Sequence, residues 1–254
     1  MHPMFHALRT FTKISIWTLF LLVALPLSAG ALWFGAQDGP RSWSEAEWHS
    51  TGTAPDPAFT PEAMVRVYYA RTGRWKSIFA VHSWIAYKPE NAQRWTRFEV
   101  VGWGRPLRQN NYPVDGLWYS NPPQVAFELR GAEATAAIGK IKLAVKTYPY
   151  SSYGSYGIWP GPNSNTFVAH IVRQVPELKT ELPAKAIGKD FLGRGLRFAS
   201  TPSNTGWQVS LGGYLGLALA LEEGLELHFL GATVGIDPLD LAIKLPSLGR
   251  IGLL

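Results

Sequence analysis

The spacing of hydrophobic and polar residues changes along the chain, and each change predicts a different kind of element. Residues 14–36 are apolar and contain no charged side chain. From residue 64 onward, apolar and polar residues alternate over short segments, which is typical of β-strands. Two later segments repeat apolar residues at every third or fourth position, as amphipathic helices do. The pattern predicts an α+β domain behind an N-terminal transmembrane helix.

The uncharged segment 14–36 is long enough to cross a membrane, because a hydrocarbon layer of ~30 Å needs ~20 apolar residues as helix. Arg9 and Lys13 precede it, and acidic residues follow it. This asymmetry predicts residues 1–13 in the cytoplasm and the domain on the periplasmic side of a bacterial inner membrane, crossed once. A cleaved signal peptide is the alternative, since Ser28–Ala31 offers small residues for cleavage. We favour an uncleaved anchor because the apolar segment continues past that point.

A linker and a core domain are expected after the anchor. Residues 37–61 are rich in Pro, Gly, Ser and Thr, and their Trp43 and Trp48 suit either the membrane interface or packing on the domain. The core is expected over residues 62–200. Its alternating segments predict an antiparallel meander of strands at 65–70, 77–87 and 94–101, followed by a short strand at 124–129.

Two helices are predicted within the core. In residues 131–148, apolar side chains such as Ile138 and Ile141 recur at helical spacing. The second helix, residues 164–175, follows a Pro-Gly-Pro turn and ends before Pro176.

Residues 201–254 are expected to form an extension rich in β-hairpins. Strands at 215–221 and 225–230, joined by Glu-Glu-Gly, form the clearest hairpin. One face of it would be bulky with leucine. We favour the core of a sheet as its role, with contact to the membrane interface as the alternative.

Composition narrows the functional classes. With 46% hydrophobic and 17% charged residues, the chain is not a disordered protein. The net charge of +6 would suit an anionic partner, but the basic residues are scattered, so no nucleic-acid binding is expected. The absence of cysteine removes disulfides, thiolate metal sites and cysteine nucleophiles. No metal and no cofactor are expected, and the oligomeric state stays open.

The candidate chemistry centres on Ser164. It lies in the first turn of its predicted helix, where unpaired amides and the positive end of the helix dipole face outward. A nucleophile there could have its oxyanion held by those amides. Serine needs a base, and His82, in a central strand, is its natural partner. The simpler interpretation is that Asn163 or Ser164 only caps the helix and that His82 is a core histidine.

The sequence Asn163-Ser164-Asn165-Thr166-Phe167 resembles the Asn-Cys-x-x-Phe motif of circularly permuted papain-like proteins, including the lecithin retinol acyltransferase-like, PPPDE-type and NlpC-related groups. There, too, a strand histidine precedes a cysteine that opens a helix. The resemblance implies a permuted papain-like core with Ser164 as nucleophile and His82 as base. Asn163 and Asn165 would cap the helix or help to hold the oxyanion. The residue that orients the histidine usually lies on the next strand, where Glu99 is the candidate.

Gly161–Phe167 and the Leu-Glu-Glu-Gly-Leu-Glu-Leu sequence at 221–227 carry a second likeness. With them, the whole chain resembles a bacterial family named for the domain of unknown function 3750. This likeness implies no activity.

Because a serine stands where the papain-like motif has its cysteine, two functions are open: binding without catalysis, and catalysis by serine. A thiol with a reference pKa of ~8.5 ionises readily beside a histidine, whereas a hydroxyl does not. The first expectation is therefore a membrane-anchored protein of the cell envelope whose papain-like cleft binds or scaffolds an envelope ligand. The alternative is an amide or ester hydrolase, or an acyltransferase, that uses Ser164 and His82 on cell-wall peptide or acyl-lipid. An unrelated β-rich envelope protein is a third possibility.

Overall fold

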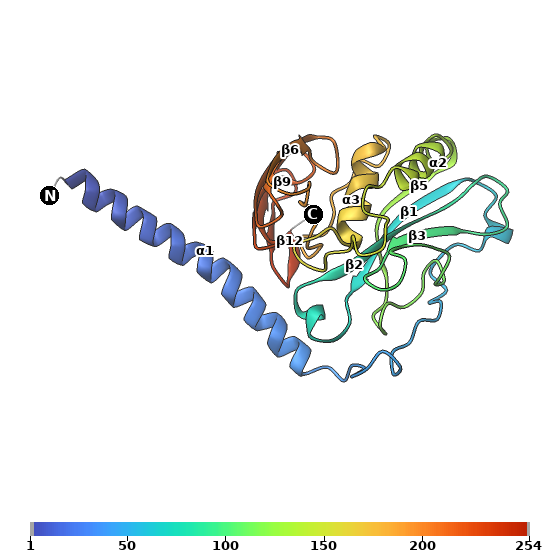
Figure 1. The fold of residues 1–254 in the computed structure, drawn as a ribbon, viewed down its shortest axis with the longest axis horizontal. Helices are drawn as coiled ribbons and strands as arrows, with labels where there is room; N and C mark the ends of the chain where they lie inside the picture. The colour runs from blue at the N-terminus through green and yellow to red at the C-terminus, as the bar shows by residue number, and fades with distance from the viewer. Residues whose placement is uncertain (1–2, 253–254) are drawn as a thin grey trace.

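Two antiparallel sheets and three α-helices make up residues 3–252, the part of the chain that the computed structural model describes (Figure 1). The α+β class expected from the alternating pattern is confirmed. The helices are α1 (Pro3–Gly35), α2 (Gly131–Lys146) and α3 (Ser164–Gln174), with short 3-10 helices η1 (Pro57–Phe59) and η2 (Arg74–Ile78).

The first sheet has five strands in the order β4-β3-β2-β1-β5. They are β1 (Met64–Arg71), β2 (Val81–Lys88), β3 (Thr96–Val100), β4 (Leu107–Gln109) and β5 (Gln124–Arg130). Because side chains alternate along a strand, β2 sends Val81 and Ile85 into the core that α2 and α3 cover. Trp84 and Ala86 face the other way, into a second cluster. Both faces of this sheet are therefore covered.

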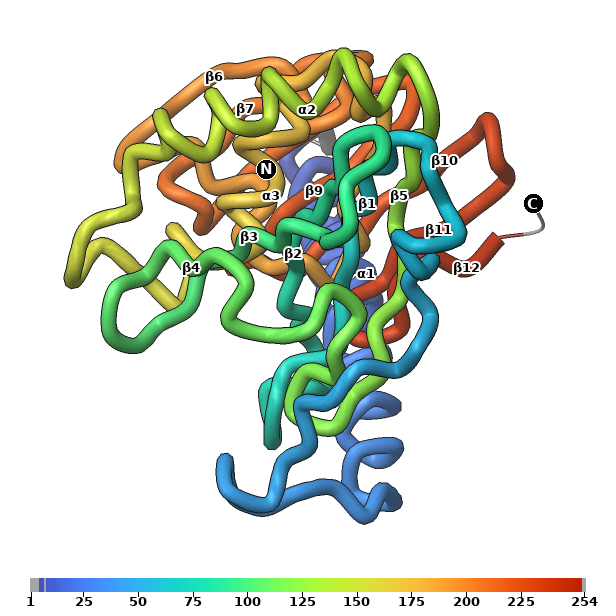
Figure 2. The backbone as a smooth tube through the Cα atoms, turned by 90° about the vertical axis from the view of Figure 1, so that its right-hand side faces the viewer, coloured from blue at the N-terminus to red at the C-terminus, as the bar shows by residue number. Residues whose placement is uncertain are grey.

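The cover of the second face comes mainly from the linker and the loop between β4 and β5, which cross the near side of the sheet in Figure 2. The rings of Trp43 and Trp48 lie in contact, with centroids 4.1 Å apart and planes tilted by 39°. Trp48 also meets the Trp118 ring edge-on at 5.2 Å. Of the two placements open to these tryptophans, the structure has them packed on the domain.

The second sheet has seven strands in sequence order, from β6 to β12. They are β6 (Leu196–Ser200), β7 (Gly206–Leu211), β8 (Leu215–Ala220), β9 (Gly224–Phe229), β10 (Ala232–Asp237), β11 (Ala242–Leu245) and β12 (Gly249–Gly252). The strands expected at 215–221 and 225–230 correspond to β8 and β9, which pair with each other within one continuous meander. The expectation that their leucine face forms the core of a sheet is wrong, because Leu217 and Leu219 are exposed. Of the other strands, β7, β10 and β12 contain glycine, which weakens their apolar pattern. Helix α3 lies between the two sheets (Figure 1).

Helix α1 is longer than the apolar segment 14–36, because the basic residues before it continue the helix from Pro3. Residues 8–35 of the described chain are long and apolar enough to cross a membrane. The C-terminal half of α1 packs on the domain through small residues. Gly30 is buried, and a Cβ there would lie 1.7 Å from Ser247 Oγ.

The connection between β1 and β2 differs from the predicted strand at 77–87. The Thr72 amide donates to Ala80 O at 3.1 Å, which closes a loop. Residues 74–78 inside that loop form η2, so pairing with β1 begins only at Val81.

Candidate functional site

A cavity of about 1120 Å³ lies at the end of the five-stranded sheet where β1 ends and β2 begins. The start of α3 and the β9–β10 turn also border it. Most of its lining is aromatic or aliphatic. These lining residues are Val23, Leu27, Trp43, Trp75, Phe79, Ala80, Val81, Trp103, Trp118, Tyr119, Tyr156, Ile158, Trp159, Ala184, Ile187, Phe229, Leu230, Ala232 and Pro246. His82, Asn163, Ser164 and Asn165 line it as well, so the predicted site residues other than Glu99 meet in one cavity.

His82 is held by a buried charged pair on β3. Its Nε2 lies 2.9 Å from Glu99 Oε2, and the Arg97 guanidinium donates to the same oxygen at 2.7 Å. Strand β3 pairs with β2 so that Arg97 lies opposite Ala86. Positions 82, 84, 97 and 99 therefore share the sheet face that is turned away from α3.

Aromatic rings pack against these polar groups. The His82 ring stacks on Trp118 at 3.6 Å with 6° between the planes. The Arg97 guanidinium lies 4.0 Å from the centroid of the Trp84 ring, within cation–π distance. Such packing fixes the imidazole in one orientation and covers one of its faces with the Trp118 ring.

Burial lowers the pKa of His82, and the positive charge of Arg97 lowers it further, whereas Glu99 opposes both effects. Burial alone would raise the pKa of Glu99, but its hydrogen bonds and the charges of His82 and Arg97 hold that pKa below its ordinary value. The stable arrangement is therefore a neutral imidazole beside a carboxylate. Nε2–H then donates to Glu99, which leaves Nδ1 as an acceptor. No hydrogen bond within residues 3–252 occupies Nδ1.

Asn163 is the N-cap of α3. Its Oδ1 accepts from the amides of Asn165 at 2.9 Å and Thr166 at 3.2 Å, and the Thr166 hydroxyl accepts from the Asn163 amide. This capping box satisfies the first turn reciprocally. The side-chain Nδ2 of Asn163 also donates to Ile187 O at 3.0 Å, which connects the cap to the loop that follows α3.

Two of the amides expected to face outward at this helix start are therefore already bonded. Those of Asn165 and Thr166 point to Asn163. Burial raises the pKa of the nearby Tyr156 to about 12, and the backbone of Ser164 opposes that rise. Because the cap satisfies the amides of Asn165 and Thr166 locally, these two are not free to hold an oxyanion in this state of the site.

Ser164 and His82 reach the cavity from different sides of β2. Ser83 faces α3, where its hydroxyl donates to Asn165 Oδ1 at 2.8 Å. His82, one residue earlier, faces the Trp118 side. The Ser164 hydroxyl makes no hydrogen bond within the described chain. The two residues line one cavity, and no hydrogen bond between them is present.

Sequence reasoning missed three residues of this site, namely Arg97, Trp118 and Tyr156. Arg97 lies two positions from Glu99 on β3, so the sequence could have placed both side chains on one face of the sheet. Trp118 and Tyr156 lie in irregular segments far along the chain from His82, and no local pattern points to them. Within residues 3–252, no group of three or more His, Asp or Glu side chains is placed to hold a metal ion.

Comparison with known proteins identifies the family. A family model described as "Protein of unknown function (DUF3750)" matches residues 62–191, about half of the chain, and the chain belongs to this family. The match spans the five-stranded sheet, α2, α3 and the cap of α3. Searches of the curated proteins and of the solved structures each found no significant match.

Proposed function

We propose that this member of the DUF3750 family is a membrane-anchored protein of the cell envelope that binds an amphiphile in the cavity at the start of α3. The ligand is an acyl chain with an anionic head group. The cavity carries this proposal, because it combines a large apolar lining with basic side chains and, among its described lining residues, no acidic one.

The apolar lining favours an acyl chain over a cell-wall peptide. Ligand pockets commonly measure roughly 300–1,000 Å³, so this cavity has room for a long chain. Each buried CH₂ contributes about 0.8 kcal/mol. A peptide would leave polar groups without partners among tryptophan and leucine side chains, which costs free energy.

The basic side chains favour an anionic head group. Arg74 and Lys76 line the cavity from η2, and Arg74 is exposed. Free fatty acids and acidic phospholipids both present an anion at the end of acyl chains, so either source fits.

The anchor supports a membrane source for the ligand. Val23 and Leu27 of α1 form part of the cavity wall, and the Arg71 guanidinium lies 4.2 Å from the centroid of the Trp33 ring. Signal cleavage near Ser28–Ala31 would separate Val23 and Leu27 from the domain, which favours the uncleaved anchor. The basic residues before the apolar segment favour an inner-membrane protein with its domain outside the cytoplasm.

Native mass spectrometry of the full chain released from micelles tests this proposal. We expect a bound adduct whose mass distinguishes a fatty acid from a phospholipid. Ala80→Trp should remove the adduct by filling the cavity, whereas Ala136→Trp, on the exposed side of α2, should keep it. If neither the wild-type chain nor the control carries an adduct after incubation with palmitate or phosphatidylglycerol, the proposal is wrong.

Catalysis is the second candidate, favoured by the neutral, oriented imidazole of His82. Ser164 Oγ would attack an ester carbonyl while His82 Nδ1 takes its proton, and Glu99 would hold the ring. The ester C–O bond would then break as His82 returns this proton to the oxygen of the leaving alcohol. Water would later hydrolyse the acyl-serine and release the acyl group as a carboxylic acid. Because the amides of Asn165 and Thr166 are bonded, the helix start would have to rearrange for them to hold the oxyanion.

A fluorophosphonate probe separates this candidate from binding alone. Labelling of the wild-type chain that disappears in Ser164→Ala, together with ester turnover, would establish catalysis. An acyl adduct without labelling would leave binding as the function.

A further inference from the structure

The seven-stranded sheet has its polar and apolar faces reversed relative to a sheet on the surface of a water-soluble domain. Along β8, Leu215, Leu217 and Leu219 are exposed, whereas Ala218 between them is buried. The register aligns the same parity across every strand, so Leu217 lies opposite Leu227 and Val209. We call this set of side chains the outer face. It consists of Leu196, Phe198, Trp207, Val209, Leu211, Leu215, Leu217, Leu219, Leu225, Leu227, Phe229, Val234, Ile236, Ile243, Leu245 and Ile251.

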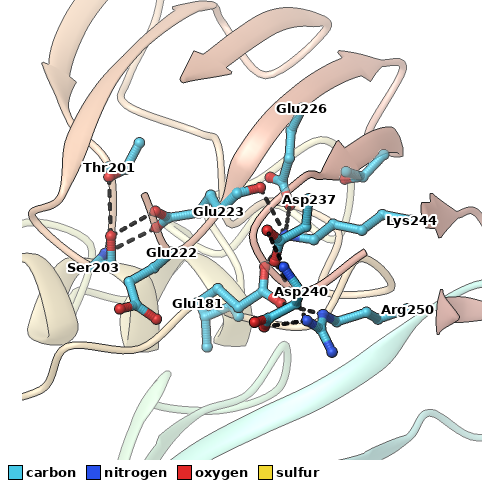
Figure 3. A network of polar contacts seen from close by, with 12 residues as sticks. Glu181, Thr201, Ser203, Glu222, Glu223, Glu226, Asp237, Asp240, Lys244 and Arg250 are labelled. Atoms are coloured by element: carbon cyan, nitrogen blue, oxygen red, sulfur yellow. Dashed lines mark hydrogen bonds and ion pairs between the residues drawn. The ribbon is translucent and has the colours of Figure 1, made fainter. Parts of the chain in front are cut away.

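The opposite side of the same sheet holds buried charges (Figure 3). Glu226 Oε2 lies 2.8 Å from Lys189 Nζ, and Glu226 Oε1 lies 3.1 Å from Lys244 Nζ. Lys244 also pairs with Glu181. At the other end of the network, the Ser203 amide donates to Glu223 Oε1 at 2.9 Å. These groups are satisfied by one another, as buried charges must be.

This reversal indicates that the outer face meets an apolar medium. Seven strands spaced about 4.8 Å apart, each with roughly five residues, cover on the order of 500 Å². That equals the largest apolar patches of ordinary monomers, about 300–600 Å², which are commonly functional. No outer-face position among the described strands carries a charge.

The turns of the sheet continue the apolar character. Turn tips usually carry polar residues or glycine. Here, exposed apolar residues stand beside them: Tyr214, Leu221, Leu230, Leu239, Leu241 and Leu248. The apolar surface therefore extends to both ends of the strands.

The position of α1 indicates which medium covers the outer face. The helix contacts β10 and β11, and Gly30 packs against Ser247 in the β11–β12 turn. From there α1 extends on the side toward which the outer face is turned (Figure 1). A helix of 33 residues is about 50 Å long, which exceeds the ~30 Å hydrocarbon layer. It can therefore cross a bilayer and still lie alongside the domain.

We propose that the outer face of the seven-stranded sheet lies on the same bilayer that α1 crosses, with its side chains among the lipid chains at the interface. The β9–β10 turn then stands at the membrane, and Phe229 and Leu230 of that turn line the cavity. The cavity opens toward lipid on this side. This docking rests on α1 as an anchor and not on the identity of the bound amphiphile.

The absence of native cysteine makes a direct depth measurement clean. Single-cysteine variants of the full chain, Leu217→Cys and Ile236→Cys, are nitroxide-labelled and placed one chain per nanodisc of phosphatidylethanolamine and phosphatidylglycerol. Leu143→Cys is the matched control, since Leu143 is also an exposed leucine but lies on α2. Paramagnetic resonance then compares collisions with oxygen, which partitions into lipid, and with a water-soluble nickel chelate.

We expect the ratio of oxygen to nickel collisions to be several-fold higher at positions 217 and 236 than at 143. Equal ratios at all three positions would overturn the proposal. Shielding from nickel that appears only when nanodiscs hold two chains would also overturn it, because a second copy would then be the occupant. A high ratio in a protein that carries no acyl adduct would leave the docking standing and remove the ligand proposal alone.

Discussion

Both sheets bury charged groups on one face, but they differ in what lies on the other face. In the five-stranded sheet, Arg97 and Glu99 lie under aromatic side chains, and the other face packs on α2 and α3. In the seven-stranded sheet, Lys244 and Glu226 lie inside while leucines point outward. Side chains alternate between the two faces along the strands of both sheets. This alternation shows only that two faces differ, and the medium on each side decides which face is polar.

The cavity and the broad apolar surface belong to different sheets. The five-stranded sheet ends in a cavity with His82 and the start of α3, both within the segment that the family model matches. The seven-stranded sheet follows that segment and offers a broad apolar surface. We infer that the first sheet carries the binding site and the second sheet orients it at the membrane.

The largest expected effect is at Glu226, which neutralises two buried lysines. Glu226→Gln should destabilise the protein by about 3–5 kcal/mol, because it leaves buried ammonium groups without a counter-charge. Denaturant unfolding of the full chain in micelles measures this. Glu222→Gln, in the exposed β8–β9 turn, is the control and should stay close to wild type. An equally mild effect at both positions would show that the buried network is not stabilising.

A core residue of one sheet and an outer-face residue of the other should respond very differently to truncation. Ile85→Ala, which removes a fully buried side chain from β2, should cost about 2–5 kcal/mol. Leu217→Ala, at an exposed position, should cost about 0.5 kcal/mol or less in micelles. Similar losses in the two unfolding experiments would contradict the reversed orientation of the second sheet.

The buried network also predicts a dependence on acid. The charges of Lys189, His228 and Lys244 outweigh the effect of burial and lower the pKa of Glu226 to about 2. A carboxyl whose pKa falls on folding adds stability above its unfolded pKa, and this is lost as pH falls through the folded pKa. The stability gap between wild type and Glu226→Gln should therefore narrow by about 3 kcal/mol between about pH 4.5 and pH 2. Unfolding curves recorded across that range check this, and a constant gap would contradict it.

The smallest effects distinguish the cap of α3 from its neighbour. Asn163→Ala should cost about 1–2 kcal/mol, since it removes the cap of two amides. Ser164→Ala should change the stability by less than about 0.5 kcal/mol, because its hydroxyl bonds nothing in the described chain. Thermal unfolding of both variants makes the comparison. A larger loss for Ser164→Ala would mean that its hydroxyl has a structural role.

Much of the first sheet and of α3 could be predicted from the sequence, because local signals define them. Alternation marked β1, and the Pro-Gly-Pro turn marked the residue at which α3 begins. The choice between Asn163 and Ser164 as cap could not be made, since both residue types cap helices. Glu99 could be named as a neighbour of His82, but its hydrogen bond depends on strand register, which hydrophobicity alone did not fix.

The reversed sheet was beyond prediction for a different reason. Alternating leucines in β8 predict two unlike faces, and their pattern is identical whether the leucines face a core or a membrane. The deciding observations are long-range, namely the Lys189–Glu226 and Lys244–Glu226 pairs beneath the sheet and the α1 contact at Ser247. None of these contacts is visible in a local window of sequence.

We propose that the cavity at the start of α3 holds an acyl chain, and photo-crosslinking examines the occupant of this cavity in place. The full chain in nanodiscs is irradiated with a phospholipid that carries a diazirine near the end of an acyl chain, and the modified peptides are mapped. We predict attachment within residues 72–82, 156–165 and 229–232, the segments that contain most of the residues lining the cavity, and its loss in Ala80→Trp. Attachment confined to α1 and the outer face, unchanged in Ala80→Trp, would contradict the claim.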